Sequence, residues 1–201
     1  LVSGTSANLS GCRPAPDAAS DGHEQAVGDD LEQGAHGTRV QRGVVGDGGR
    51  RHLARPVQLS VADGRRVLAA DILGTGEADV GGWQFHMILA SAGERSLGLQ
   101  VGQLLALVRW ACKRYRTTAV DVRATGQVLP VVALMAAALE PRRIRSIATN
   151  GLLDTLGRLV DFPIPYASAV PLFCFGLLRE FDIADLMDLS APTIVTEANR
   201  G

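Results

Sequence analysis

Aromatic residues are scarce in this 201-residue chain, and none precedes Trp83. The first 55 residues hold ten glycines and no isoleucine or lysine. A stretch of this composition buries too little apolar surface to offset the entropy lost on ordering its backbone. We therefore expect residues 1–55 to be loop or disorder, and a globular domain to occupy residues 56–201.

Lysine is almost absent: the chain has one lysine, Lys113, and nineteen arginines. Such a bias is typical of GC-rich coding sequence. GC-rich DNA translated out of frame also yields Gly, Arg, Ala, Asp and Pro in the proportions of residues 1–55. We hypothesise that part of this segment is mistranslated sequence upstream of the domain, and an intact reading frame across the junction would refute the hypothesis.

The chain also lacks an excess of charge, paired cysteines and long apolar runs. Its net charge of −1 provides no basic surface for nucleic acid. Cys12, Cys112 and Cys174 are widely separated, which predicts neither a disulfide framework nor a metal site. The apolar run before Glu140 and Pro141 is too short to cross a bilayer. We expect no cofactor, no metal, and neither a nucleic-acid nor a membrane partner.

The sequence does contain short apolar runs, typical of buried strands, that alternate with segments of helical periodicity. We expect neighbouring parallel strands over residues 65–72, 117–122, 144–149 and 193–195. Apolar residues recur at helical spacing over residues 97–116, and an alanine-rich helix is predicted over residues 130–139. The alternation predicts an α/β fold, with a three-layer α/β/α arrangement around a mainly parallel sheet.

A further helix is predicted after Phe181, with Asp182 as its N-terminal cap and Asp185 at its third position. Asp182, Asp185 and Asp188 are spaced three apart, which could suggest a cation site. Calcium loops need closely spaced oxygen ligands and a glycine turn, however. A helix cap beside a solvated face is therefore the favoured interpretation.

Gly74 and Gly76 follow the first expected strand and form a turn. A dinucleotide-binding turn requires a third glycine where Asp79 stands, so a Rossmann-type domain is the weaker alternative. Tight binding of a nicotinamide cofactor would support it. The aromatic cluster around Trp83 and His86 could form either a pocket rim or part of the core.

Four segments resemble the α/β-hydrolase superfamily. The strand and glycine turn of the family resemble "RRVLAADILGTGEA", and the helix before its nucleophile strand resembles "LLALVRWACKRY". Acetyl xylan esterase-like and dienelactone-hydrolase-like serine hydrolases are similar to "ALMAAALEPRRIRSIATNGLL" and, most specifically, to "YASAVPLFCFGLLREFDIADLMDLSAPTIV". The resemblance covers about residues 56–201. It implies a partial α/β-hydrolase fold and ester hydrolysis by a Ser, Asp and His triad with an oxyanion hole.

Carried over residue by residue, the resemblance places the nucleophile at Gln127 or Val128, and neither side chain can attack an acyl carbon. Thr125 is the hydroxyl residue at this turn, and we expect it to point away from the site. Glu197 is the nearest carboxylate for the acid, with a solvated end residue as the alternative. No histidine stands at the position of the family's base; the four are His23, His36, His52 and His86.

The resemblance therefore predicts a truncated or catalytically inactive relative of carbohydrate esterases. Its expected ligand is a small ester or an acetylated carbohydrate. A pseudoenzyme with a binding or assembly role is the alternative. The sequence begins at Leu1 without a leader pattern, and a histidine-bearing strand and helix encoded just downstream would indicate truncation.

Overall fold

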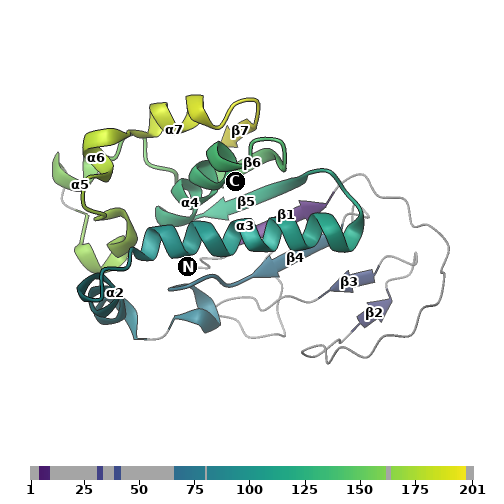
Figure 1. Cartoon of the computed structure of the whole chain (residues 1–201), viewed down its shortest axis with the longest axis horizontal. Coiled ribbons are helices and arrows are strands. Elements are labelled where there is room, and N and C mark those ends of the chain that lie inside the picture. Colours follow the sequence, from purple (N-terminus) through teal and green to yellow (C-terminus); the bar gives the residue numbers. More distant parts are fainter. Residues whose placement is uncertain are drawn as a thin grey trace.

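The structure, a computed structural model, describes residues 5–9, 31–33, 39–41, 66–79, 81–161 and 164–197. Its main sheet has five strands in the order β4-β1-β5-β6-β7 (Figure 1). These are β1 (Thr5–Leu9), β4 (Arg66–Ala70), β5 (Val120–Thr125), β6 (Ile144–Asn150) and β7 (Ile194–Glu197). A separate antiparallel pair joins β2 (Leu31–Gln33) to β3 (Arg39–Gln41).

Strands β5, β6 and β7 pair in parallel, which confirms the predicted α/β class. Strand β1 is antiparallel to both β4 and β5, so β4 runs in the same direction as β5. The strand expected over residues 117–122 begins later, at Val120. The reason is a turn: Arg116 leaves the preceding helix with a φ of 51°, and the Thr117 hydroxyl donates to the Ala119 carbonyl at 3.0 Å.

Strand β1 differs most from the sequence expectation. It lies between β4 and β5, which were expected to be neighbours, and it falls in the segment expected to be loop or disorder, as do β2 and β3. Apolar strands on both sides provide hydrogen-bond partners for its backbone, so a five-residue strand forms without a strong apolar pattern of its own. The rest of residues 1–55 lies outside the described residues. The boundary near residue 55 and the mistranslation hypothesis stay predictions.

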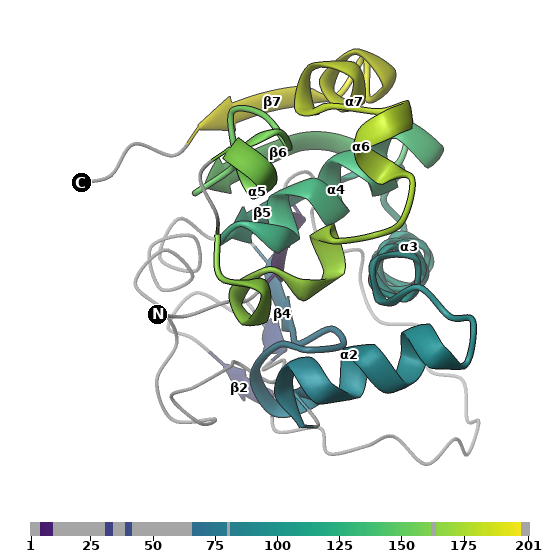
Figure 2. The same ribbon diagram turned by 90° about the vertical axis from the view of Figure 1, so that its left-hand side faces the viewer.

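The larger helices follow the strands. They are α2 (Gly82–Ser91), α3 (Ser96–Tyr115), α4 (Val128–Leu139) and α7 (Ile183–Leu189), with short turns α5 (Arg158–Asp161), α6 (Leu177–Glu180), η2 (Gly76–Ala78), η3 (Tyr166–Ser168) and η4 (Val170–Leu172). Strands β4 to β7 follow one another across the sheet in one direction, and right-handed crossovers then place α3, α4 and α7 on one face. Figure 2 shows α3 end-on beside α4, with α7 on the far side of α4. None of the described helices is long and apolar enough to span a bilayer.

Helix α4 is the centre of the core. Its residues from Leu129 to Leu134 are all buried, as are Ala136 and Ala137. Helix α3 packs beside it through the apolar face expected from the sequence, which includes Leu97, Val101, Leu104 and Val108. Each large side chain buried here contributes roughly 1.5–3 kcal/mol. The helical expectations for both segments are confirmed.

The predicted cap of α7 is also confirmed. Asp182 and Asp185 form a capping box, in which the Asp182 amide donates to Asp185 Oδ2 at 2.8 Å. The Asp182 carboxylate also accepts from the Thr155 hydroxyl and the Leu156 amide, each at 2.6 Å. Burial alone would raise the pKa of Asp182, but these hydrogen bonds lower it.

In residues 66–79, 81–161 and 164–197, no group of His, Cys, Asp and Glu side chains could hold a metal ion.

Replacing the cap should destabilise the fold. We expect Asp182→Ala to lower the free energy of unfolding by about 1–2 kcal/mol at neutral pH, because it removes the cap of α7 and a partner of Thr155. Denaturant unfolding measures this. Asp188→Ala is the matched control, since Asp188 is exposed on the same helix and should change the free energy by less than about 0.5 kcal/mol. Equal effects of the two substitutions would contradict the prediction.

Candidate functional site

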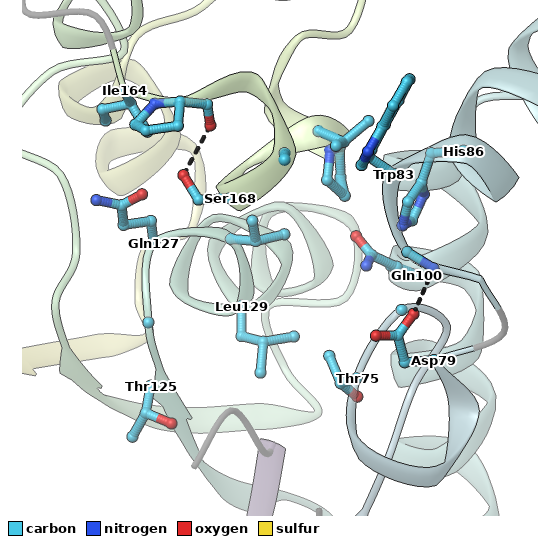
Figure 3. A pocket seen from close by; sticks show the side chains of 18 residues that line it. Thr75, Asp79, Trp83, His86, Gln100, Thr125, Gln127, Leu129, Ile164 and Ser168 are labelled. Atoms are coloured by element: carbon cyan, nitrogen blue, oxygen red, sulfur yellow. Dashed lines mark hydrogen bonds between the residues drawn. The ribbon is translucent and has the colours of Figure 1, made fainter. Parts of the chain in front are cut away.

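A crevice of about 630 Å³ opens at the carboxyl ends of β4 and β5 (Figure 3). Three segments that follow strands contribute to it: the glycine turn after β4, the turn from β5 into α4, and residues 164–171 after β6. Helices α2 and α3 provide the remaining wall. In α/β sheets, ligands bind outside the carboxyl ends of the strands. The crevice is therefore the candidate functional site.

The glycine turn is held in place by α3. Two glutamines of that helix bind the backbone of Leu73. Gln100 Nε2 donates to the Leu73 carbonyl at 2.7 Å, and the Leu73 backbone amide donates to Gln103 Oε1 at 2.8 Å. Gly74 follows with a φ of +74°. The next full helix, α2, begins only at Gly82, so the turn does not open a helix as a dinucleotide-binding turn does.

Gln100 and His86 converge behind this turn. A Cβ atom built on Gly74 would lie 2.8 Å from His86 Nε2 and 3.8 Å from Gln100 Nε2. Gln100 is 1% exposed and His86 is 8% exposed. Among the described residues, no hydrogen-bond partner is present for Gln100 Oε1 or His86 Nδ1. Buried polar atoms without a partner are rare in folded proteins, and both of these atoms are closed off from solvent behind the crevice wall.

The crevice carries little charge. Burial lowers the pKa of His86, and the Asp79 carboxylate opposes this only in part. His86 is therefore neutral at pH 7 and above. Of the lining residues that the structure describes, Asp79 is the one with a full charge, and its carboxylate accepts from the Gly82 amide at 3.1 Å.

The turn from β5 into α4 forms a second side of the crevice. Gly126 has a φ of +88°, and its amide donates to the Asn150 carbonyl at 2.8 Å. Gln127 occupies the N-cap position of α4 without a side-chain capping bond. The amides of Val128 and Leu129 belong to the first turn of the helix, where backbone N–H groups lack partners within the helix. This side of the crevice thus offers hydrogen-bond donors.

Residues 164–171 line a third side of the crevice, beyond the carboxyl ends of the strands. The Ser168 hydroxyl donates to the Pro165 carbonyl at 2.7 Å, as Figure 3 shows. Trp83 is 40% exposed at the rim, and its ring meets that of Tyr166 edge-on at a centroid distance of 6.4 Å. Of the two interpretations of Trp83 and His86, a pocket rim or the core, the crevice favours the rim for Trp83 and places the buried His86 in its wall.

The structure brings some of the predicted site residues together. Gln127 and Val128 line the crevice. Thr125, which was expected to point away from the site, lines it as well, from the end of β5. Glu197 does not line it. That residue is exposed on β7, level with Thr149 of β6, so β6 separates it from β5. Of the four histidines, His86 lines the crevice, and the others lie outside the described residues.

Sequence reasoning missed Gln100. Its position carries a signal, because Gln100 interrupts the apolar stripe of α3, three residues after Leu97 and four before Leu104. A polar residue on a buried helix face needs a hydrogen-bond partner. That requirement points to a site without revealing that His86 lies beside it.

Gly74 should tolerate no side chain. We expect Gly74→Ala to destabilise the fold by roughly 1–2 kcal/mol, because its positive φ disfavours an L residue and the added methyl would collide with the His86 ring. Gly102→Ala should instead increase the stability of the fold. Gly102 lies within α3 with open space around it, and alanine there should stabilise by about 0.5–1 kcal/mol. Thermal melts of both variants measure the difference, and a neutral Gly74→Ala would contradict this geometry.

His86 should make stability depend on pH. Its folded-state pKa lies below the ordinary value of 6.5, so below pH 6.5 the unfolded chain takes up a proton that the folded chain resists. Stability is therefore fully present above pH 6.5 and falls as the pH drops towards the folded-state pKa. Denaturant unfolding at pH 8 and pH 5.5 should show a larger loss in the wild type than in His86→Asn. Equal losses would show that His86 is not responsible.

No match is found when the chain is compared with models of protein families, with curated protein sequences and with solved structures. The site is thus defined by its own geometry: a weakly charged crevice at the carboxyl ends of β4 and β5, with Gln100 and His86 in one wall and the first turn of α4 in another.

Proposed function

We propose that the chain is a catalytically inactive relative of α/β serine ester hydrolases, similar to acetyl xylan esterases. In this proposal it binds a small ester or an acetylated carbohydrate in the crevice without hydrolysing it. The proposal includes a partial α/β-hydrolase fold, with a third layer on the sheet face opposite α3, α4 and α7. The proposed role is that of a pseudoenzyme.

One observation carries the proposal. The unit formed by β5, its tight turn and α4 has the form in which hydrolases of this class expose a nucleophile, and Gln127 stands where that turn enters the helix. Gln127 lines the crevice, but a carboxamide cannot form an acyl intermediate. The scaffold of a nucleophile site is thus combined with a side chain that has no nucleophilic chemistry.

The remaining polar groups support the absence of turnover. Glu197 is separated from the crevice, and Ser168 uses its hydroxyl proton in the bond to the Pro165 carbonyl. His86 and Ser168 lie on opposite sides of the crevice (Figure 3). The amides at the start of α4 and the apolar residues beside them suit an acyl carbonyl and its short chain. Binding without reaction is the consequence.

Hydrolysis of p-nitrophenyl acetate tests the proposal. We expect no rate above that of a control protein of similar size and charge, because removal of triad members from a serine hydrolase costs on the order of 10⁶-fold in rate. Gln127→Ser alone should not restore activity, since it adds a hydroxyl without a base in reach. Release of p-nitrophenolate followed by absorbance is the measurement.

Two variants identify the source of any rate that is seen. Turnover that is lost in Thr125→Ala or in Ser168→Ala would make that residue the nucleophile and overturn the proposal. Turnover that survives both substitutions would show that chemistry unrelated to the family operates. Binding of the ester without turnover, followed through a change in tryptophan fluorescence that is lost in Trp83→Phe but kept in Trp110→Phe, is the supporting result.

A further inference from the structure

Basic side chains gather at the end of the molecule opposite the crevice. Strands β4, β5 and β6 run in one direction and begin at this end, and α3 runs from the crevice towards it (Figure 1). The exposed cations come from the last turns of α3 and from the connection between α4 and β6. They are Arg109, Lys113, Arg114, Arg116, Arg142 and Arg143. We call this group of residues the basic end.

An aromatic pair joins the basic end to the start of β4. The guanidinium carbons of Arg66 and Arg114 lie over the Tyr115 ring, 5.4 and 5.8 Å from its centroid. The Trp110 ring meets that of Tyr115 edge-on, with 5.9 Å between the ring centroids. Arg66 thus adds a further cation beside the exposed ones, and an exposed tryptophan lies next to them.

Positive charge is in excess at this end. Of the acidic residues that the structure describes there, Glu140 is shared between Arg109 and Arg143, with Glu140 oxygens 2.5 and 2.9 Å from the two Nε atoms. Asp121 is paired with Arg145, so these two charges cancel. The remaining cations are not offset by nearby carboxylates of the described residues. The fold therefore separates charges that the net value of −1 averages over the chain.

This distribution was not visible in the sequence. We expected neither a nucleic-acid nor a membrane partner, because the net charge is close to zero and the apolar runs are short. Net charge does not show where the fold places its cations. A short apolar run excludes a segment that crosses a bilayer, whereas contact with the surface of one leaflet requires no such segment.

Two exposed apolar side chains lie among the cations. Trp110 follows Arg109 in α3 and is 42% exposed, and Leu139 precedes Glu140 at the end of α4 and is 66% exposed. Both are therefore adjacent to the ion pair between Arg109 and Glu140. Tryptophan is enriched where lipid head groups meet the acyl chains. Binding to such an interface strengthens with buried apolar area as well as with charge.

We infer that the basic end binds the surface of a membrane that contains anionic lipids. The arginine and lysine side chains bind the anionic groups of the lipids, and Trp110 and Leu139 enter the head-group region. Each Lys or Arg close to such a surface strengthens binding about fivefold. The surface is separate from the crevice, so the inference does not rest on the proposed function.

A nucleic acid offers similar phosphate groups but fits this surface less well. Single-stranded bases bind by stacking on the faces of aromatic rings. At the basic end, the Trp110 ring is packed edge-on against Tyr115, and the Tyr115 ring is already in contact with Arg66 and Arg114. Leu139 can neither stack on a base nor form a hydrogen bond with it. An anionic lipid surface uses both the charged and the apolar side chains.

Flotation of the full chain with lipid vesicles tests this. The vesicles consist of phosphatidylcholine alone, or of phosphatidylcholine with about a third phosphatidylserine. We expect the chain to float with the anionic vesicles at low salt and to bind phosphatidylcholine at least about tenfold less tightly. Binding to the anionic vesicles should also fall at least about tenfold when NaCl is raised to about 0.5 M, because salt screens the charges.

Two matched double variants locate the surface. Lys113→Gln with Arg142→Gln removes two exposed cations that form no ion pair with the described residues, and it should weaken binding to anionic vesicles about 25-fold. Arg95→Gln with Arg179→Gln is the control. It changes the net charge equally, just before α3 and in α6, away from the basic end (Figure 1), and should bind within about twofold of the wild type. The two vesicle types tested on the wild type decide the question if a variant fails to fold.

The emission of Trp110 shows whether this side chain enters the lipid. In Trp83→Phe, Trp110 is the one tryptophan of the chain, and its emission should move to shorter wavelength with anionic vesicles. Three results would overturn the inference: no binding to anionic vesicles, equal effects of the two double variants, or binding without a change in Trp110 emission. Tighter binding of a single-stranded oligonucleotide at the same ionic strength would overturn it too and favour a nucleic-acid partner. None of these outcomes bears on ester turnover in the crevice.

Discussion

Helix α4 has apolar side chains on every side, and its residues from Leu129 to Leu134 are all buried, so the arrangement of its neighbours follows from the need to cover this stretch. The sheet lies beneath it, and α3 and α7 lie against its flanks. Because the buried side chains of α4 pack closely on these neighbours, packing holds the start of α4 at the end of β5. The crevice therefore has one wall whose position is determined by the core itself.

A second constraint acts from the other side of the crevice. Gln100 and Gln103 of α3 hold both backbone groups of Leu73, which ties the turn after β4 to a helix that also packs on α4. Both walls are thus attached to the same pair of helices. A ligand of the kind proposed would meet a crevice held on two sides by packed helices, which would reduce the conformational entropy lost on binding.

Much of this architecture could be predicted from the sequence, because periodicity and capping are local signals. The apolar stripe of α3 and the capping box at Asp182 are examples. Strand β1 could not be predicted, since its pairing depends on strands far along the chain. The crevice was predicted only in part: the turn at Gln127 followed from a family resemblance, whereas the meeting of His86 with Gln100 depends on how α2 packs beside α3.

The central position of β1 has a consequence for the kinetics of folding. Thr5 pairs with Ala70 on one side and with Ala124 on the other, so the middle of the sheet is built from contacts between residues remote in sequence. Closing such long loops has an entropic cost that must be met before the pairing contributes any stability. High contact order slows folding. Because β1 must join β4 to β5, we expect the folding rate to be limited by the formation of these long-range strand pairs rather than by helix formation.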